Sequence, residues 1–190
     1  AMESHRTKNT NQDNNTPRIY VASLSDYNAG HLYGCWIDAN QPVEDIHDEI
    51  ARMLAHSNEP PAEEWAIHDY ENFGTLRIPE FEDLERLAEV AGLMDVHGPL
   101  FAELVGHFGD TSNVEEARRC MEDAYRGAFD SLADYAGDFI EDCYSDLLKS
   151  LPDFIRYHID YDGIGRDLEL GGDIFTVNHD GQLHVFDART

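Results

Sequence analysis

Positively charged residues are scarce in this sequence. Only 13 of its 190 residues are lysine or arginine, whereas 39 are aspartate or glutamate, so the formal charge at pH 7 is −26. A chain of this charge repels polyanions, which makes nucleic acids and anionic membranes poor direct partners and a basic protein a favourable one. Hydrophobic residues still make up 42% and aromatic residues 11% of the chain, which predicts a folded core rather than a disordered acidic tail.

Cysteine is also scarce, and long apolar runs are absent. Cys35, Cys120 and Cys143 are odd in number, scattered and outside any CxxC motif, a usage typical of reduced, cytoplasmic proteins. The sequence contains no run of about 18 apolar residues and no visible signal peptide. We therefore expect a soluble, cytoplasmic protein with no membrane partner.

The pattern of polar and apolar residues predicts an α+β fold of three small domains behind a polar leader. Residues 1–16 lack hydrophobic periodicity and predict a flexible leader with no role in the fold. Residues 17–78 predict an N-terminal α+β domain, residues 79–122 a small helical bundle, and residues 123–190 a C-terminal α+β domain. The net charge is −8 over residues 17–78 and −14 over residues 79–147, which predicts a strongly acidic surface along the chain.

The first domain is predicted to contain strands around one helix. Alternating β-forming residues predict strands at Arg18–Leu24, His31–Asp38 and Glu64–Tyr70, with a loop at Ser25–Gly30. Proline is favoured in the first helical turn, and residues 42–57 show helical periodicity behind Pro42.

Prolines and glycines divide the second domain into short helices. Pro79 predicts the start of a helix with Phe81 on its inner face and Gly92 near its end. A second helix is predicted within residues 98–109, and the capping-box sequence SNVE at residues 112–115 predicts the start of a third.

The third domain combines a short strand, an acidic helix and a hairpin. The strand is expected at Tyr125–Phe129 and the helix at Ser131–Leu147, where Ser131 and Asp134 resemble a capping box. The hairpin is expected at Asp173–Asp187 around its Asp-Gly turn.

The helix at Ser131–Leu147 carries five carboxylates and no lysine or arginine. Its acids lie opposite or beside an apolar face that is expected to run from Leu132 to Leu147. Residues 134–146 of a straight helix rise roughly 18 Å, over which one DNA strand carries roughly five phosphates. An acidic surface shared by three helices is predicted to contain Asp45, Asp48, Glu49, Glu82, Glu85, Glu89, Asp134, Asp138, Glu141, Asp142 and Asp146.

The segment after this helix, Leu148–Leu170, is nearly balanced in charge and rich in aromatic residues. Ser150 is predicted to cap a short helix in which Pro152 comes early and in which Phe154 and Ile155 share an apolar face. Such a patch is either intradomain core or a subunit contact, and spacing alone favours core.

Three long stretches of this sequence resemble antirestriction proteins of the ArdA family. They are PRIYVASLSDYNAGHLYGCWID at Pro17–Asp38, YRGAFDSLADYAGDFIED at Tyr125–Asp142, and LLKSLPDFIRYHIDYDGIGRDLELGGDIFTVN at Leu147–Asn178. The resemblance covers roughly Pro17–Phe186. It implies an elongated, three-domain homodimer that mimics B-form DNA, occupies the DNA-binding groove of type I restriction–modification enzymes and is carried on mobile DNA.

The resemblance also assigns an antirestriction motif, which is associated with the dimer contact. It maps onto Ser150, Leu151, Pro152, Asp153, Phe154, Ile155, Arg156, Tyr157, His158, Ile159, Asp160 and Tyr161. No cofactor, metal or covalent step is expected, and inhibition by charge and geometry needs no base-specific readout.

Other readings of the sequence remain open. His158, Asp160 and Asp162 alternate as possible metal ligands but lack the remaining positions of a calcium loop. GxSxG, P-loop and GxGxxG motifs are absent, so we expect no enzyme. An acidic chaperone, or an inhibitor of another basic DNA-binding protein, would share this composition, and so would a protein adapted to high salt.

Overall fold

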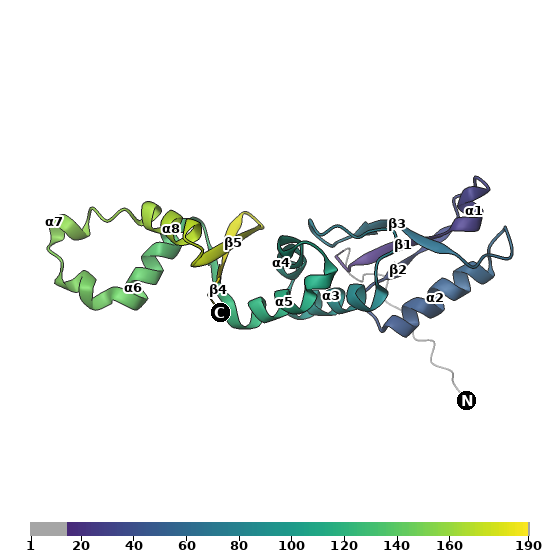
Figure 1. The fold of residues 1–190 in the computed structure, drawn as a ribbon, viewed down its shortest axis with the longest axis horizontal. Helices are drawn as coiled ribbons and strands as arrows, with labels where there is room; N and C mark the ends of the chain where they lie inside the picture. Colours follow the sequence, from purple (N-terminus) through teal and green to yellow (C-terminus); the bar gives the residue numbers. More distant parts are fainter. Residues whose placement is uncertain (1–14, 190) are drawn as a thin grey trace, which may run out of the picture. The chain divides into compact units, whose positions relative to one another are not determined.

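The structure is a computed structural model that describes residues 15–189. Within this range the chain forms two compact units (Figure 1). The N-terminal unit comprises residues 15–73 and Ile78–Ala91, and the C-terminal unit comprises Gly74–Arg77 and residues 92–189. Each unit combines helices with a three-stranded antiparallel sheet, which confirms the predicted mixed α+β class.

The boundary between the two units lies inside one helix, α3 (Leu84–His97). The predicted division into three domains stays a prediction. The predicted leader lies outside the described residues except for its last two. None of the helices within residues 15–189 is long and apolar enough to cross a membrane.

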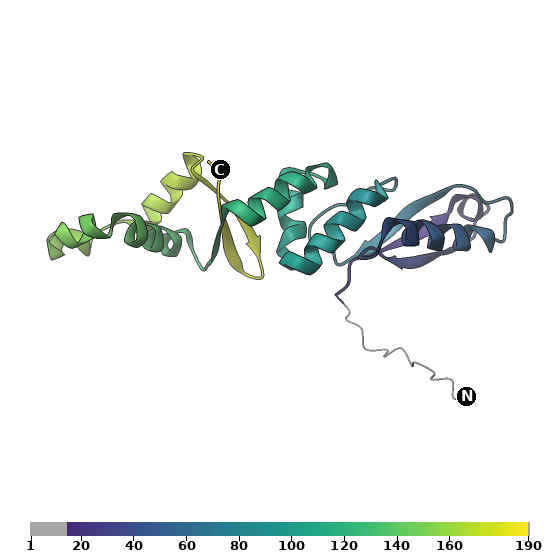
Figure 2. The same ribbon diagram turned by 90° about the horizontal axis from the view of Figure 1, so that it is seen from below.

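The N-terminal sheet has the strand order β2-β1-β3, so β3 is an edge strand. Its strands are β1 (Arg18–Ser23), β2 (Gly34–Asp38) and β3 (Trp65–Glu71). They agree with the predicted strands, although β2 begins three residues later than expected. The helix α2 (Val43–Ala55) begins directly after Pro42, as predicted, and lies along the sheet in Figure 2. The core between helix and sheet contains Ile19, Val21, Ile37, Ile46, Ile50, Met53 and Ile67.

The predicted loop at Ser25–Gly30 is wrong, because a short helix, α1 (Leu24–Asn28), occupies most of it. The Ser23 hydroxyl accepts a hydrogen bond from the Asp26 backbone N–H and caps this helix. The Asp26 carboxylate is fully buried and accepts hydrogen bonds from the Ser57 hydroxyl (2.5 Å) and the Asn58 backbone N–H (3.2 Å). This carboxylate therefore connects α1 to the loop that follows α2.

The helix α3 also departs from its prediction at both ends. It starts at Leu84 because the Asp83 carboxylate accepts a hydrogen bond from the Arg86 backbone N–H (3.1 Å), which satisfies a donor of the first turn. Pro79 and Phe81 precede the helix, and 72% of the Phe81 surface is exposed rather than buried. The helix continues through Gly92 and ends before Gly98, whose positive φ of 83° suits a helix terminus.

Three helical segments follow in the C-terminal unit. The helix α4 (Leu100–Phe108) ends at Gly109, as predicted. The predicted capping box at residues 112–115 is wrong, because the Asp110 carboxylate accepts the hydrogen bond from the Ser112 backbone N–H (2.8 Å) and starts a 3₁₀ turn at Thr111–Asn113. The helix α5 (Val114–Arg119) follows and runs into a π-helical turn at Cys120–Ala124.

The C-terminal sheet has the strand order β4-β6-β5. The strand β4 (Tyr125–Phe129) is confirmed at both of its predicted ends. The hairpin of β5 (Ile174–His179) and β6 (Gln182–Asp187) is also confirmed, and both residues of its Asp-Gly turn have positive φ angles. This turn conformation matches the right-handed twist of the two strands.

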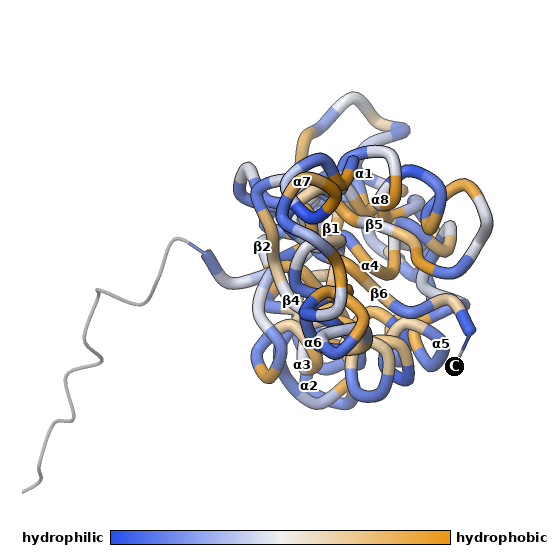
Figure 3. Tube along the Cα trace, turned by 90° about the vertical axis from the view of Figure 1, so that its left-hand side faces the viewer, coloured by the Kyte–Doolittle hydropathy of each residue, from blue (hydrophilic) through white to orange (hydrophobic). Residues whose placement is uncertain are grey.

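Two long helices pack beside this sheet: α6 (Leu132–Ser150) and α8 (Tyr161–Leu170). The short helix α7 (Asp153–Arg156) lies between them in the chain (Figure 1). Hydrophilic and hydrophobic residues alternate along the helices of the trace rather than forming separate blocks (Figure 3). The buried cluster of this region consists of Tyr135, Ile174 and Val185, with Phe129, Leu132, Phe139 and Leu168 packed against it.

Candidate functional site

The predicted carboxylates of α2 lie on the outer side of the N-terminal unit. Asp45 and Asp48 are exposed, and Glu49 is half-buried. The Glu49 carboxylate accepts a hydrogen bond from the Gln41 side-chain amide (2.9 Å). The buried residues of α2 are Ile46, Ile50 and Met53, so the hydrophobic face holds the helix against the sheet and leaves these acids on the other side.

The three predicted acids around α3 do not form one helical stripe. Glu85 and Glu89 are exposed and lie four residues apart on the helix, so they share a face. Glu82 precedes the helix and is half-buried, and its carboxylate accepts a hydrogen bond from the Asp83 backbone N–H (2.9 Å). The sequence prediction placed Glu82 on the helix because it started the helix at Pro79.

The acidic helix α6 has the predicted cap but is not straight. The Ser131 hydroxyl accepts a hydrogen bond from the Asp134 backbone N–H (3.1 Å) and donates one to the Asp134 carboxylate (2.6 Å). Tyr144 has a non-helical backbone (φ −131°, ψ 26°) that interrupts the helix. The roughly 18 Å rise predicted for residues 134–146 is therefore wrong, because only the part before Tyr144 is a continuous helix.

All five predicted carboxylates of α6 are exposed. Four of them precede the break and span about 12 Å of helix axis, at about 1.5 Å per residue; Asp146 follows the break. The apolar face opposite them is buried only in its first half, at Tyr135 and Ala136, whereas Leu147 is 58% exposed. The part of α6 beyond the break thus leaves apolar as well as acidic side chains in contact with solvent.

The ion pairs of the protein leave most of this predicted surface uncompensated. With Glu82 set aside, no carboxylate of the predicted acidic surface forms an ion pair with a lysine, arginine or histidine of residues 15–189. Eight of the ten arginines within residues 15–189 pair with other acids: Arg18 with Glu71, Arg86 with Asp83, Arg118 with Glu115, Arg119 with Glu116, Arg126 with Asp187, Arg156 with Asp153, Arg166 with Asp162 and Arg189 with Asp173. Arg52 lies on α2 itself, where its Nε–H donates to the Asp48 backbone carbonyl (3.3 Å).

The motif segment, Ser150–Tyr161, contains no buried residue. The exposed fractions are 73% for Phe154, 44% for Ile155 and 75% for Tyr157. The interpretation of this patch as core of the chain is therefore wrong, because its apolar side chains are exposed to solvent in the single chain. Ser150 is also not the predicted cap, since it is the last residue of α6 and its hydroxyl donates to the Leu147 carbonyl (2.7 Å).

The two aspartates considered as metal ligands have other partners in the structure. The Asp160 carboxylate accepts a hydrogen bond from the Gly163 backbone N–H (2.9 Å) and caps α8, and Asp162 pairs with Arg166 (3.1 Å). Across residues 15–189, no group of three or more histidine, cysteine, aspartate or glutamate side chains has a geometry that would hold a metal ion.

Two buried polar groups were missed by sequence reasoning, and both have structural partners. Burial by itself raises the pKa of Asp26, but hydrogen bonds from Ser57, Ser23 and Asn58 outweigh it and hold this pKa below its ordinary value. Burial lowers the pKa of His184, whose ring lies 2.8 Å from the Tyr125 hydroxyl. Sequence reasoning missed them because the Asp26 partners Ser57 and Asn58 and the His184 partner Tyr125 are distant in the chain.

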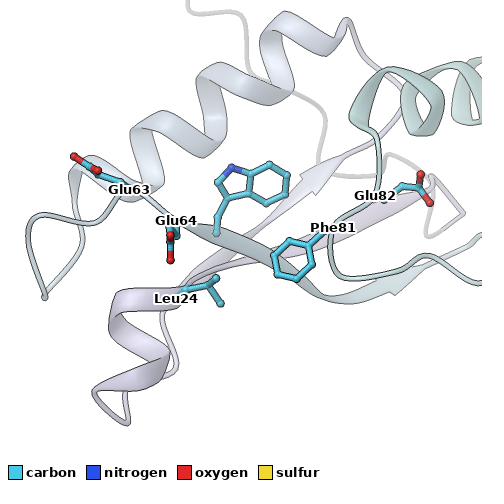
Figure 4. Close-up of a pocket in the computed structure, with 6 residues that line it drawn as sticks. Leu24, Glu63, Glu64, Phe81 and Glu82 are labelled. Atoms are coloured by element: carbon cyan, nitrogen blue, oxygen red, sulfur yellow. The ribbon is translucent and has the colours of Figure 1, made fainter.

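A pocket of about 500 Å³ in the N-terminal unit was also missed. It lies beside the start of β3 and is lined by Leu24, Glu63, Glu64, Trp65, Phe81 and Glu82 (Figure 4). The only signal in the sequence is that acids flank both aromatic residues, and such flanks are common in a chain of this composition.

Comparison with known families gives one match of broad coverage. The model of the family described as antirestriction protein (ArdA) matches residues 19–181. A search of curated proteins found no match. The matched range includes nearly all of the N-terminal sheet, the strands β4 and β5, the acidic helices and the whole motif segment, and it ends before β6. Because it spans most of the chain, this protein belongs to the ArdA family of antirestriction proteins.

Proposed function

We propose that this protein inhibits type I restriction–modification enzymes by occupying their DNA-binding groove as a mimic of B-form DNA. The observation that carries the proposal is the largely uncompensated charge of the predicted acidic surface: its carboxylates are mostly exposed, and eight of the ten arginines within residues 15–189 pair with acids outside it. A groove that binds DNA must be basic, so these carboxylates would meet cations that normally contact phosphates.

The density of charge on α6 supports this mode of binding. Its four carboxylates before Tyr144 span about 12 Å, and a DNA strand carries one phosphate per 3.4 Å of axis, or about four over that length. Because the acids are held on a folded helix, binding requires little ordering of the inhibitor. Inhibition would protect incoming mobile DNA whatever sequence the enzyme recognises, since phosphate contacts carry no direct base information.

We further propose that the active form is a homodimer joined through the motif segment. Exposed aromatic and aliphatic side chains at Phe154, Ile155 and Tyr157 form an apolar patch on an otherwise acidic chain. A two-fold contact would bury this patch against its own copy, which is a self-complementary arrangement. It would also double the length of acidic surface available to one target.

A competition experiment tests the proposal. A purified type I restriction–modification enzyme is bound to labelled DNA and titrated with the protein at low and at high salt. We expect stoichiometric displacement that weakens as salt rises, because the contact is electrostatic. If DNA stays bound while the folded protein is in excess, the proposal fails, and an acidic chaperone or an inhibitor of another basic DNA-binding protein becomes the better interpretation.

Two variants that remove the same number of charges test whether the positions of the carboxylates matter for inhibition. The triple variant Asp138→Asn/Glu141→Gln/Asp142→Asn removes three unpaired charges of α6. Its control, Glu115→Gln/Glu116→Gln/Asp162→Asn, removes three charges that already pair with arginine. We expect the α6 variant to weaken displacement roughly tenfold to a hundredfold, since each exposed charge contributes up to about 1 kcal/mol. The Asp138→Asn variant alone should weaken displacement by no more than about fivefold, because one exposed charge contributes up to about 1 kcal/mol. Equal losses in both triple variants would mean that net charge, and not its layout, determines inhibition.

A further inference from the structure

The pocket beside β3 combines exposed aromatic surface with carboxylates. Phe81 is 72% exposed, and Leu24 and Trp65 are half-buried. Glu64 lies beside Leu24, whereas the carboxylates of Glu63 and Glu82 point outward at opposite ends of the pocket (Figure 4). A large aromatic side chain left in solvent forgoes the free energy of burial, so a ligand that covered Phe81 in this pocket would recover part of that free energy.

The backbone holds this arrangement in place. The Leu24 backbone N–H donates to the Glu64 carbonyl (3.0 Å), and Trp65 is paired with Ser23 across β1 and β3. On the other edge of β3, the Ile67 backbone N–H donates to the Glu80 carbonyl (2.9 Å). This bond fixes the chain directly before Phe81 against the edge strand.

The same unit shows how an arginine binds such a combination of side chains. The guanidinium of Arg18 lies 4.7 Å from the ring centre of Trp36 and pairs with the Glu71 carboxylate (2.7 Å). Indole stacking and a carboxylate partner are thus both satisfied by one arginine. The pocket offers an indole, a phenyl ring and carboxylates, yet none of its six lining residues is a lysine or arginine.

We propose that this pocket receives an arginine side chain of the basic protein that the inhibitor binds. The guanidinium would lie against Trp65 and Phe81 and pair with Glu64, while the aliphatic part of the side chain would contact Leu24. The pocket volume of about 500 Å³ admits such a side chain with adjacent backbone. The identity of the partner rests on the proposed function, whereas the chemistry of the pocket does not.

The test is a titration of the full-length protein with the capped peptide acetyl-Gly-Arg-Gly-amide, followed by NMR. The indole N–H signal of Trp65 should shift with saturation in the millimolar range, and that of Trp36 should not. The same peptide with citrulline in place of arginine is neutral and should bind at least fivefold more weakly. Equal binding of both peptides, or equal shifts of both tryptophans, would overturn the proposal.

Variants separate the pocket from general charge attraction. Phe81→Ala should weaken peptide binding about two- to fivefold through the lost cation–π contact, and it should leave the fold intact because Phe81 is mostly exposed. Glu63→Gln/Glu64→Gln should weaken binding more than the control Glu44→Gln/Asp48→Asn, which removes the same charge from α2. Equal losses in the two double variants would contradict a specific pocket.

The DNA competition assay distinguishes this inference from the proposed function. Phe81→Ala should also displace DNA about two- to fivefold less well than the unchanged protein. If the unchanged protein displaces DNA but the arginine peptide does not bind, only the pocket inference fails. If the peptide binds at Trp65 but DNA is not displaced, the pocket inference stands and the proposed target is wrong.

Discussion

The substitution Phe154→Asp distinguishes a subunit contact from an unused surface patch. Phe154 is 73% exposed in the single chain, so the change removes little packing within the chain. Fully burying a phenylalanine contributes about 1.5–3 kcal/mol, and the exposed part therefore accounts for about 1–2 kcal/mol. In a two-fold contact each copy loses this contribution, which gives about 2–4 kcal/mol per dimer.

This loss corresponds to a dimer that dissociates roughly 30- to 700-fold more readily, at about 1.4 kcal/mol per factor of ten. Sedimentation equilibrium over a range of protein concentrations measures this change, and the melting temperature at high dilution reports the stability of the monomer. The control Val96→Asp changes another exposed residue, 72% exposed on α3 and outside the motif segment, and it should leave dimerisation unchanged.

Two results would refute this reasoning. An unchanged dissociation constant for Phe154→Asp would show that the patch is not the contact. An unfolded variant would show that Phe154 contributes to a core, contrary to its exposure. A folded monomer that still displaces DNA would support Phe154 as part of the dimer contact. It would also show that inhibition does not require the dimer.

Three further predictions concern stability. The pKa of Asp26 is lowered in the fold, so the stability it contributes is present above its ordinary value of 3.8 and is lost as the pH falls through the lower folded value; chemical denaturation should show the deficit of Asp26→Asn shrinking from pH 7 to pH 3. Ser131→Ala removes the cap of α6 and should cost about 1 kcal/mol in the free energy of unfolding. Gly165→Ala should destabilise by about 1–3 kcal/mol, because a Cβ there would lie 2.6 Å from a backbone oxygen of α6. Its control, Gly137→Ala, meets no atom within 4 Å and should be neutral or stabilising by up to about 1 kcal/mol; equal effects of the two alanine variants in thermal melts would contradict the close packing.

The elements that could be predicted from the sequence are those that local chemistry determines. The Asp180-Gly181 turn requires two positive φ angles, which few other residue pairs adopt, and it therefore marked the hairpin. The Ser131 hydroxyl accepts from the backbone N–H of Asp134 and donates to its carboxylate within one turn, so the start of α6 could be predicted from four residues.

The elements that were wrongly predicted depend on contacts with distant parts of the chain. Pro79 suits the first turn of a helix but equally suits an extended segment, and the bond from Ile67 to Glu80 favours the extended form. That bond also explains why Phe81 is exposed. Gly92 and Gly98 are both acceptable helix ends in sequence terms, and the helix continues to the second because Met94 is buried in the core.

The candidate site was predictable in composition but not in geometry. Exposed acids on α2 and α6 follow from the hydrophobic pattern of each helix, which fixes the opposite face. The break at Tyr144, the exposure of the motif segment and the pocket at Trp65 do not follow from any local pattern, because each depends on what the rest of the chain leaves uncovered.

The helix α3 has a consequence for dissecting the protein into fragments. Its first half, with the buried Leu84, Leu87 and Val90, belongs to the N-terminal unit, and its second half, with the buried Met94, belongs to the C-terminal unit. A truncation at either flanking loop would deprive one fragment of half a helix and uncover the apolar residues that it protects. Neither fragment is therefore a neutral substitute for the intact chain in binding experiments. Fragments made to locate an activity in one unit should each include the whole of α3.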